Sequence, residues 1–217
     1  MIRLRAVFAK TDRAKYISHL DLNRFMLRTF RRSKLPVWYT EGFNPHPYYS
    51  FALALSLGFE SECEILDFNL NEEMPFDEVR DRLNAVMPDG MRIISVNEQK
   101  MKITEIAKAE YRFSLLTSSP EKLSEDIERL LSSKEILVEK KTKKGVKTVD
   151  IKPYTEVTER EKTADSVNMT VRFPAGTQTN YNPSLFFDAL KNFSQVSFEP
   201  AEIKRTGILC SDNTKFQ

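Results

Sequence analysis

Hydrophobic and polar residues alternate at the start of the chain and then recur at helical spacing. Alternation in residues 2–9 predicts a half-buried strand whose outer face begins with arginine. Ser18 and Asp21 form a helix-capping signature just before the helical pattern begins. The buried stripe of this predicted helix consists of Leu22, Phe25, Met26 and Phe30. The first 36 residues therefore predict a strand and an amphipathic helix that Pro36 ends.

The same patterns continue to about residue 99. Alternation predicts strands at 37–40, 49–57, 64–70 and 91–96, and helical spacing predicts a helix at 76–86. Large residues alternate with small ones in 49–57, which indicates burial on both faces. The order strand, helix, two strands, helix, strand is typical of a ferredoxin-like βαββαβ unit. We assign this unit to residues 1–99.

The pattern restarts after a polar connection at 97–108. It predicts strands near 111–115 and 167–173, helices beginning near Pro120 and Pro183, a hairpin of 135–140 with 147–151, and final extended pieces to residue 209. The turn of this hairpin, around Lys143, is strongly basic. Residues 100–217 therefore predict a second ferredoxin-like unit decorated by a basic hairpin. The predicted fold class is α+β, with two tandem ferredoxin-like units and antiparallel sheets.

Composition is that of a globular protein with no membrane segment. The chain has 217 residues, of which 41% are hydrophobic and 29% charged. No stretch approaches the roughly 20 apolar residues that cross a bilayer, and the N-terminus lacks the apolar core of a signal peptide. We therefore expect a cytoplasmic protein that does not bind a membrane. Cys63 and Cys210 form no metal-binding motif, so we expect free thiols and no metal or other cofactor.

Charge is segregated along the chain although the net charge is only +2. Residues 1–50 contain ten Lys or Arg against three Asp or Glu, whereas residues 51–99 contain three against eleven. A basic patch of this kind attracts polyanions if folding leaves it exposed. The alternative is that folding interleaves the two blocks and no patch survives.

The basic block combines arginines with aromatic residues, which is the combination that single-stranded RNA recognition uses. The arginines neutralise phosphates, and aromatic rings between residues 38 and 49 stack on bases. The candidate RNA-binding residues are Arg24, Arg28, Arg31, Arg32, Tyr39, Asn44, His46 and Tyr48. In the alternative interpretation, Trp38 and Phe43 belong to the core, and the arginines form a solvated helix face paired with the acidic 60–81 segment.

The two histidines are candidate catalytic residues. His19 lies in the first turn of the predicted helix, where the positive end of the helix dipole favours a neutral imidazole that can act as a general base. His46 lies between Pro45 and Pro47, which stiffen the loop and preset His46 and Asn44 for binding. Equally, His19 can simply secure the turn before the helix, and the loop can be a rigid connector.

Two strings in this region resemble a known family. KYISHLDL (15–22) and GFNPHP (42–47) are similar to motifs of a bacterial family of unknown function, the radical-SAM-linked domain. Weaker similarities lie at 150–154 and 205–207. The resemblance implies association with a radical-SAM protein. The chain itself lacks the C-x-x-x-C-x-x-C iron–sulfur motif of such enzymes, so the resemblance implies a non-redox role.

The predicted tandem architecture also resembles that of CRISPR repeat-processing endoribonucleases, at the level of fold only. Those enzymes have a glycine-rich loop near the C-terminus, where residues 205–209 of this chain offer one glycine. We therefore expect an accessory protein that recognises RNA, in a tRNA or rRNA modification context, together with a radical-SAM partner. The alternatives are a metal-independent ribonuclease that uses His19 or His46, and a module that docks only protein.

Overall fold

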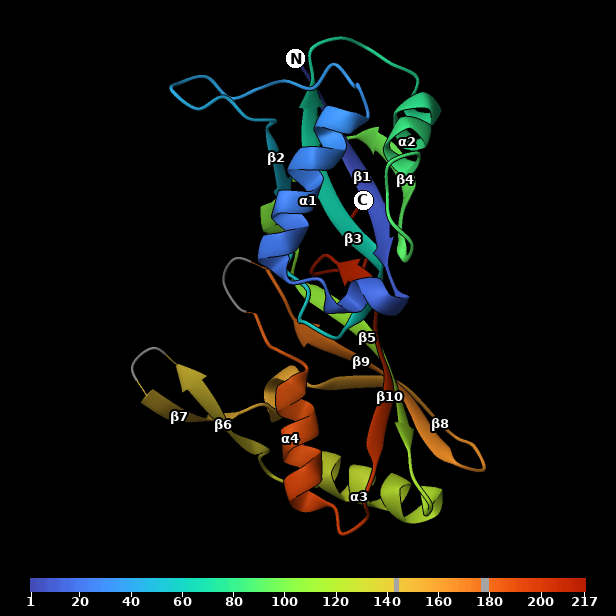
Figure 1. The fold of residues 1–217 in the computed structure, drawn as a ribbon. Helices are drawn as coiled ribbons and strands as arrows, with labels where there is room; N and C mark the ends of the chain where they lie inside the picture. The colour runs from blue at the N-terminus through green and yellow to red at the C-terminus, as the bar shows by residue number, and fades with distance from the viewer. Residues whose placement is uncertain (143–144, 177–179) are drawn as a thin grey trace.

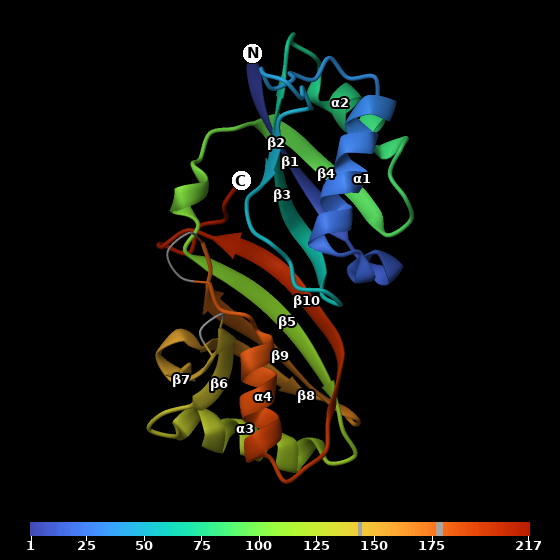
Figure 2. The same cartoon turned by 60° about the vertical axis from the view of Figure 1, so that its left-hand side comes forward.

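The computed structural model describes residues 1–142, 145–176 and 180–217. It is an α+β structure in which a mostly antiparallel, eight-stranded sheet runs through the whole molecule (Figures 1 and 2). Its strand order is β4-β1-β3-β10-β5-β9-β8, and β2 also pairs with β3. The strands of this sheet are β1 (Ile2–Lys10), β2 (Tyr49–Phe51), β3 (Glu60–Leu70), β4 (Met91–Glu98), β5 (Lys108–Leu116), β8 (Glu156–Lys162), β9 (Ser166–Pro174) and β10 (Glu199–Leu209).

Helices α1 (His19–Arg32) and α2 (Phe76–Asn84) cover one face of the N-terminal part of the sheet (Figure 1). The alternation of β1 explains this packing, because Leu4, Ala6 and Phe8 all point to the helix side. Their cross-strand partners on β3 continue the same layer, with Leu4 opposite Phe68. The first strand and first helix that the sequence predicts are thus confirmed.

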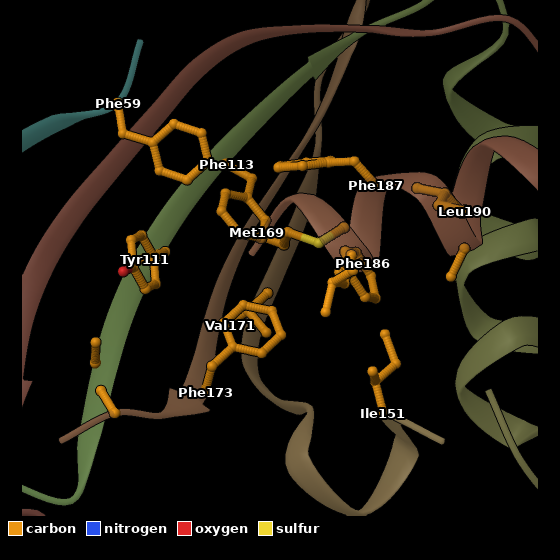
Figure 3. Packing of buried hydrophobic residues seen from close by; sticks show 14 of the residues in the cluster. Phe59, Tyr111, Phe113, Ile151, Met169, Val171, Phe173, Phe186, Phe187 and Leu190 are labelled. Atoms are coloured by element: carbon orange, nitrogen blue, oxygen red, sulfur yellow. The ribbon is translucent and has the colours of Figure 1, made fainter. Parts of the chain in front are cut away.

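Helices α3 (Pro120–Ser132) and α4 (Ser184–Phe193) pack on the C-terminal part of the sheet. Aromatic rings dominate this core, and Figure 3 shows Phe113 at its centre between β9 and α4. The Phe113 and Phe187 ring centroids lie 4.6 Å apart. Phe113 also stacks on Phe186 from the same helix. Tight aromatic packing of this kind fixes α4 against the sheet.

The predicted basic hairpin is confirmed as a separate two-stranded sheet of β6 (Leu137–Thr142) and β7 (Gly145–Asp150). Lys143 and Lys144, at its turn, lie outside the described residues. Three short 3-10 turns complete the fold, η1 (Asp12–Tyr16), η2 (Ile103–Glu105) and η3 (Lys152–Tyr154). No helix in the described parts of the chain is long and apolar enough to cross a bilayer.

Two predicted strands differ from the structure. The strand predicted at 49–57 ends at Phe51, because β10 occupies the edge of β3 opposite Glu60 and Ser61, where a longer β2 would have to pair. Residues 52–59 leave the sheet instead, and Leu53 packs in the C-terminal core. The strand predicted at 37–40 is reduced to two isolated bridges, which join Val37 to Leu70 and Tyr39 to Pro47.

A buried polar cluster joins the two parts of the sheet where β10 meets β3. The Arg205 guanidinium lies 2.8 Å from the Glu64 carboxylate, and it donates to the Ala54 carbonyl oxygen and the Tyr111 hydroxyl. Arg205 is 1% exposed and Glu64 3%. The neighbouring Lys10 ammonium donates to the Ile17 carbonyl oxygen at 2.8 Å, and burial lowers its pKa. The cluster therefore connects the sheet to the turn before α1, through Ile17, and to the loop after β2, through Ala54.

A second buried ion pair lies on the sheet face opposite the helices. The Arg5 guanidinium contacts both oxygens of Asp67, at 2.7 and 2.8 Å. It also donates to the carbonyl oxygens of Met101 and Gln217, and it lies 4.2 Å from the ring centroid of Phe216. The C-terminal segment is thereby held against β1, and the Phe216 N–H also donates to the Ile208 carbonyl oxygen of β10.

The junction cluster predicts a large loss of stability in Glu64→Gln. This substitution leaves Arg205 and Lys10 as buried cations without their carboxylate, so the free energy of unfolding should fall by about 3–5 kcal/mol. Urea denaturation measures this change. Glu62→Gln, an exposed position on the same strand that pairs with Lys204, should change it by less than about 1 kcal/mol. Equal losses of unfolding free energy in the two variants would contradict a large contribution of the buried cluster to stability.

Candidate nucleic-acid interface

Helix α1 presents four arginines to solvent. Its start is fixed by Ser18, whose Oγ accepts from the Asp21 backbone N–H and donates to the Asp21 carboxylate. Its buried residues are Leu22, Met26, Thr29 and Phe30, and Phe25 is half-buried beside them. The opposite side carries Arg24, Arg28, Arg31 and Arg32, all exposed. We call these four residues the basic side of α1.

The acidic 60–81 segment does not neutralise the basic side of α1. Within the described residues, only Arg24 of the four has an ion-pair partner, Asp21 of the same helix at 3.3 Å. The acidic residues of α2 are instead paired within α2, through Arg80 and Arg82. The Arg28 Nε–H donates to the Arg24 carbonyl oxygen, which orients its guanidinium along the helix. The basic side thus remains available to an anionic ligand.

The stretch 39–47, here called loop 39–47, projects from the molecule beyond the C-terminal end of α1 (Figure 1). Its base is closed by the bridge between Tyr39 and Pro47 and by a hydrogen bond from the Thr40 N–H to the His46 carbonyl oxygen. Every residue from 41 to 46 is exposed, and Phe43 at the tip is fully exposed (112%). Phe43 is therefore not a core residue, contrary to one of the two sequence interpretations.

His46 is oriented by its own loop. Its Nδ1 lies 3.0 Å from the Asn44 carbonyl oxygen and 3.2 Å from the Thr40 hydroxyl. Because a carbonyl oxygen only accepts, this contact favours the Nδ1–H form, which leaves Nε2 as the acceptor in a neutral ring. Tyr39 lies at the base of the same loop and is 40% exposed.

His19 is not brought near His46. It begins α1, whereas loop 39–47 follows the end of that 14-residue helix, which is about 21 Å long. His19 is exposed, and its ring packs edge to face with the Phe51 ring, with the two ring centroids 5.5 Å apart. The structure therefore places the two candidate catalytic histidines at opposite ends of α1, His19 in its first turn and His46 in the loop beyond its last.

Tyr48 and Trp38 lie on the other side of the sheet from the basic side of α1. Together with Arg3 they line a depression of ≈ 420 Å³. Arg3 faces Asn69 across β1 and β3, on the face opposite Leu4 and its core partners. The sequence predicted the aromatic residues as RNA-binding residues, but it did not predict Arg3 or Asn69 as part of the same site. The only local signal was the arginine-rich outer face of the first strand.

Two of the family-like stretches, 15–22 and 205–207, contact the junction cluster. The Lys15 and Ile17 carbonyl oxygens accept from Lys10, and Lys15 also accepts from the Gly58 N–H. At the other end of the chain, Arg205 lies inside β10 and contacts Glu64. Part of each of these two stretches therefore has a structural role at the junction, whereas 42–47 lies in the exposed loop 39–47. Residues 205–209 form a buried strand end rather than a glycine-rich loop.

Cys63 lines another depression, of ≈ 360 Å³, between β3 and the C-terminal segment. Burial, together with the nearby Glu64 carboxylate, raises the pKa of the Cys63 thiol to about 12. A thiol of this kind stays protonated at neutral pH and is a poor nucleophile. Cys63 and Cys210 are both free.

The chain belongs to a family described as an uncharacterized protein conserved in bacteria, DUF2344, whose model matches residues 3–183. No curated protein matches the chain.

The solved structures that match this chain include the following two. One is a chain from the crystal structure of a Cbf5-Nop10-Gar1 complex, with 12% sequence identity and a TM-score of 0.50. The match covers 94% of this chain and 48% of that one, so the present chain spans about half of its length. At this identity the likeness concerns the fold alone. The other is an unknown protein from Galdieria sulphuraria, with 13% identity, coverage of 92% and 98%, and a TM-score of 0.26, too low to support a conclusion.

The Cys63 environment predicts a pH-dependent loss of stability. The unfolded thiol, with a pKa near 9.0, loses its proton above pH 9, whereas the folded thiol keeps it to about pH 12. The folded state then binds more protons, so the free energy of unfolding falls as pH rises, by up to about 1.4 kcal/mol per pH unit. Urea denaturation from pH 8 to 11 should show this slope in the wild type and in Cys210→Ser, but a shallower one in Cys63→Ala. Parallel profiles for all three proteins would contradict it.

Proposed function

We propose that this chain is a non-redox accessory protein that recognises single-stranded RNA and works beside a radical-SAM partner. The observation that carries the RNA part is the continuity between the basic side of α1 and loop 39–47. Arg31 and Arg32 end the helix, and the loop with its exposed aromatic residues begins a few residues later. Phosphate-binding arginines next to exposed rings fit an unpaired strand.

The location of the arginines argues for a ligand rather than for stability. Exposed arginines without carboxylate partners contribute little to folding, whereas they can each neutralise one phosphate and release its counterion. Arg28 is three residues from Arg31 and four from Arg32, so the three side chains are neighbours on the helix surface and present a line of charge along α1. In this proposal Asn44 and His46 supply directional hydrogen bonds to bases.

RNA binding should depend on salt and on the unpaired arginines. In Arg28→Ala/Arg31→Ala, affinity for a single-stranded RNA oligonucleotide should fall, and the slope of log K against log salt should decrease by about 1.4, because each lost phosphate contact contributes about 0.7. Filter binding at several salt concentrations measures both quantities. Arg80→Ala/Arg82→Ala removes the same charge from α2, where both arginines are already paired, and should have little effect. Equal losses in the two double variants, or binding insensitive to salt, would reject this interface.

Protein docking is a second candidate function, favoured by one observation. A phenylalanine that is fully exposed at the tip of a loop stiffened by two prolines has no packing role in this chain. An apolar side chain presented in this way fits a pocket on a protein partner. The radical-SAM partner that the sequence resemblance implies is the partner we propose.

Phe43→Ser should separate docking from folding. Because Phe43 makes no buried contact, its replacement should leave the melting temperature within about 1–2 °C of the wild type. Capture of a co-expressed radical-SAM protein from the same organism should nevertheless fall at least tenfold, as measured by affinity purification. Phe193→Ser on α4, also an exposed phenylalanine, is the matched control and should retain capture. Undiminished capture by Phe43→Ser would exclude this tip as the docking residue.

The ribonuclease alternative receives less support, because a second imidazole is not available near either His19 or His46. A single exposed histidine can still act as a general base, but no described feature near either one favours cleavage over binding. Persistence of RNA cleavage in chelator, lost in His19→Ala or His46→Ala, would revive it.

We also infer that each half of the chain is a ferredoxin-like unit. The N-terminal strand order β4-β1-β3-β2 and the C-terminal order β10-β5-β9-β8 support this inference. Each corresponds to the order 4-1-3-2 when the strands are counted within their own half, and each half has two helices between its strands. The β6–β7 hairpin is then an insertion in the second unit.

A further inference from the structure

The depression beside Trp38 has the geometry of a small-ligand site. It measures ≈ 420 Å³, which lies in the range of about 300–1,000 Å³ usual for such sites. It opens on the sheet face that the helices leave uncovered, at the end of β3 nearest loop 39–47. The lining residues are Met1, Arg3, Trp38, Tyr48, Asn69 and Gln99.

The two aromatic residues are fixed by backbone hydrogen bonds to the sheet. The Trp38 N–H donates to the Asn69 carbonyl oxygen at 2.9 Å, and the Tyr48 N–H donates to the Trp38 carbonyl oxygen at 3.0 Å. The rings meet edge to face, with centroids 5.5 Å apart and an interplanar angle of 70°. Trp38 is half-buried and Tyr48 is 44% exposed. Two rings held at this angle form a corner that a third flat ring can enter.

Polar groups surround this aromatic corner. Arg3 is exposed and has no ion-pair partner among the described residues. The Asn69 amide is buried, yet among the described residues its Nδ2 meets only a thioether, the Met1 Sδ at 3.4 Å, which is a weak acceptor. A ligand carbonyl oxygen or ring nitrogen would be a better partner for this donor.

We propose that this pocket binds one nucleobase, stacked in the corner of Trp38 and Tyr48, with its polar edge towards Asn69 and its phosphate near Arg3. The assignment rests on the proposed RNA-binding function, which supplies the source of the base. A stacked base gains binding energy whatever its identity, and an amide reads its hydrogen-bonding edge. A guanidinium next to a stacking site suits the attached phosphate.

Trp38 makes the proposal directly measurable, since it is the only tryptophan of the chain. Titration of the full chain with adenosine and uridine 5′-monophosphates should quench its fluorescence in a saturable way, because a base stacked on the indole changes its surroundings. Tyr48→Ala should raise the apparent Kd by about 5- to 150-fold, the loss expected for one stacking ring. Tyr48→Phe keeps the ring and should bind like the wild type, which separates stacking from a failure to fold.

Two controls address the geometry of the site. Tyr16→Ala removes an exposed tyrosine of η1 that does not line the pocket, so the Kd should not change. Arg3→Ala should weaken the monophosphates while leaving the corresponding nucleosides unaffected. Quenching that is linear with concentration, or equal losses in Tyr16→Ala and Tyr48→Ala, would overturn the assignment.

The RNA-binding and fluorescence measurements together distinguish a failure of the nucleobase pocket from a failure of the proposed RNA-binding function. RNA binding that depends on Arg28 and Arg31 without any change in Trp38 fluorescence would reject the nucleobase pocket and leave the RNA-binding function standing. Saturable binding of monophosphates without any RNA binding would support the nucleobase pocket and reject the RNA-binding function.

Discussion

The contact between Arg205 and Glu64 is the constraint on which the rest of the structure depends. Only two residue pairs, Lys204 with Glu60 and Arg205 with Ser61, form the ladder between β10 and β3. So short a ladder holds few hydrogen bonds, and the buried ion pair adds charged contacts there, together with the Tyr111 and Ala54 contacts of Arg205. Because both charges are almost fully buried, the geometry tolerates little change. Two half-sheets thereby become one continuous sheet.

This junction also determines which parts of the conspicuous N-terminal segment remain free for recognition. Lys10 and Arg205 fix the carbonyl oxygens of Ile17 and Ala54, so the turn before α1 and the loop after β2 serve as scaffold. The other end of α1 lies outside the junction, and its contact with a cation is an exposed one, from the Arg82 guanidinium to the Lys34 carbonyl oxygen at 3.2 Å. The exposed arginines and loop 39–47 lie at that end, where a ligand can approach without disturbing the junction.

Local patterns were enough to predict α1, because Ser18, the apolar stripe and the arginines all lie within one short segment. Local patterns gave a wrong prediction for residues 52–57. Large and small residues alternate there as in a strand, but the segment leaves the sheet after Phe51. Leu53 packs in the C-terminal core, and β10 takes the strand edge that the alternation seemed to require. Competition for an edge between strands more than 130 residues apart leaves no local signal. The pairing of Arg3 with Asn69 escaped sequence patterns for the same reason.

The division of the candidate site between two faces limits the shape of its ligand. Val37 points into the helix-side core, whereas Trp38, the next residue, lines the pocket on the opposite face. A ligand that contacts both Arg32 and Trp38 must therefore bend around the edge of the sheet near Leu70, where this segment pairs with β3. A duplex is too stiff for so sharp a turn, and its bases are already stacked and paired. A flexible single strand can follow the edge and place one unstacked base in the pocket, so the two-sided arrangement favours single-stranded over double-stranded RNA.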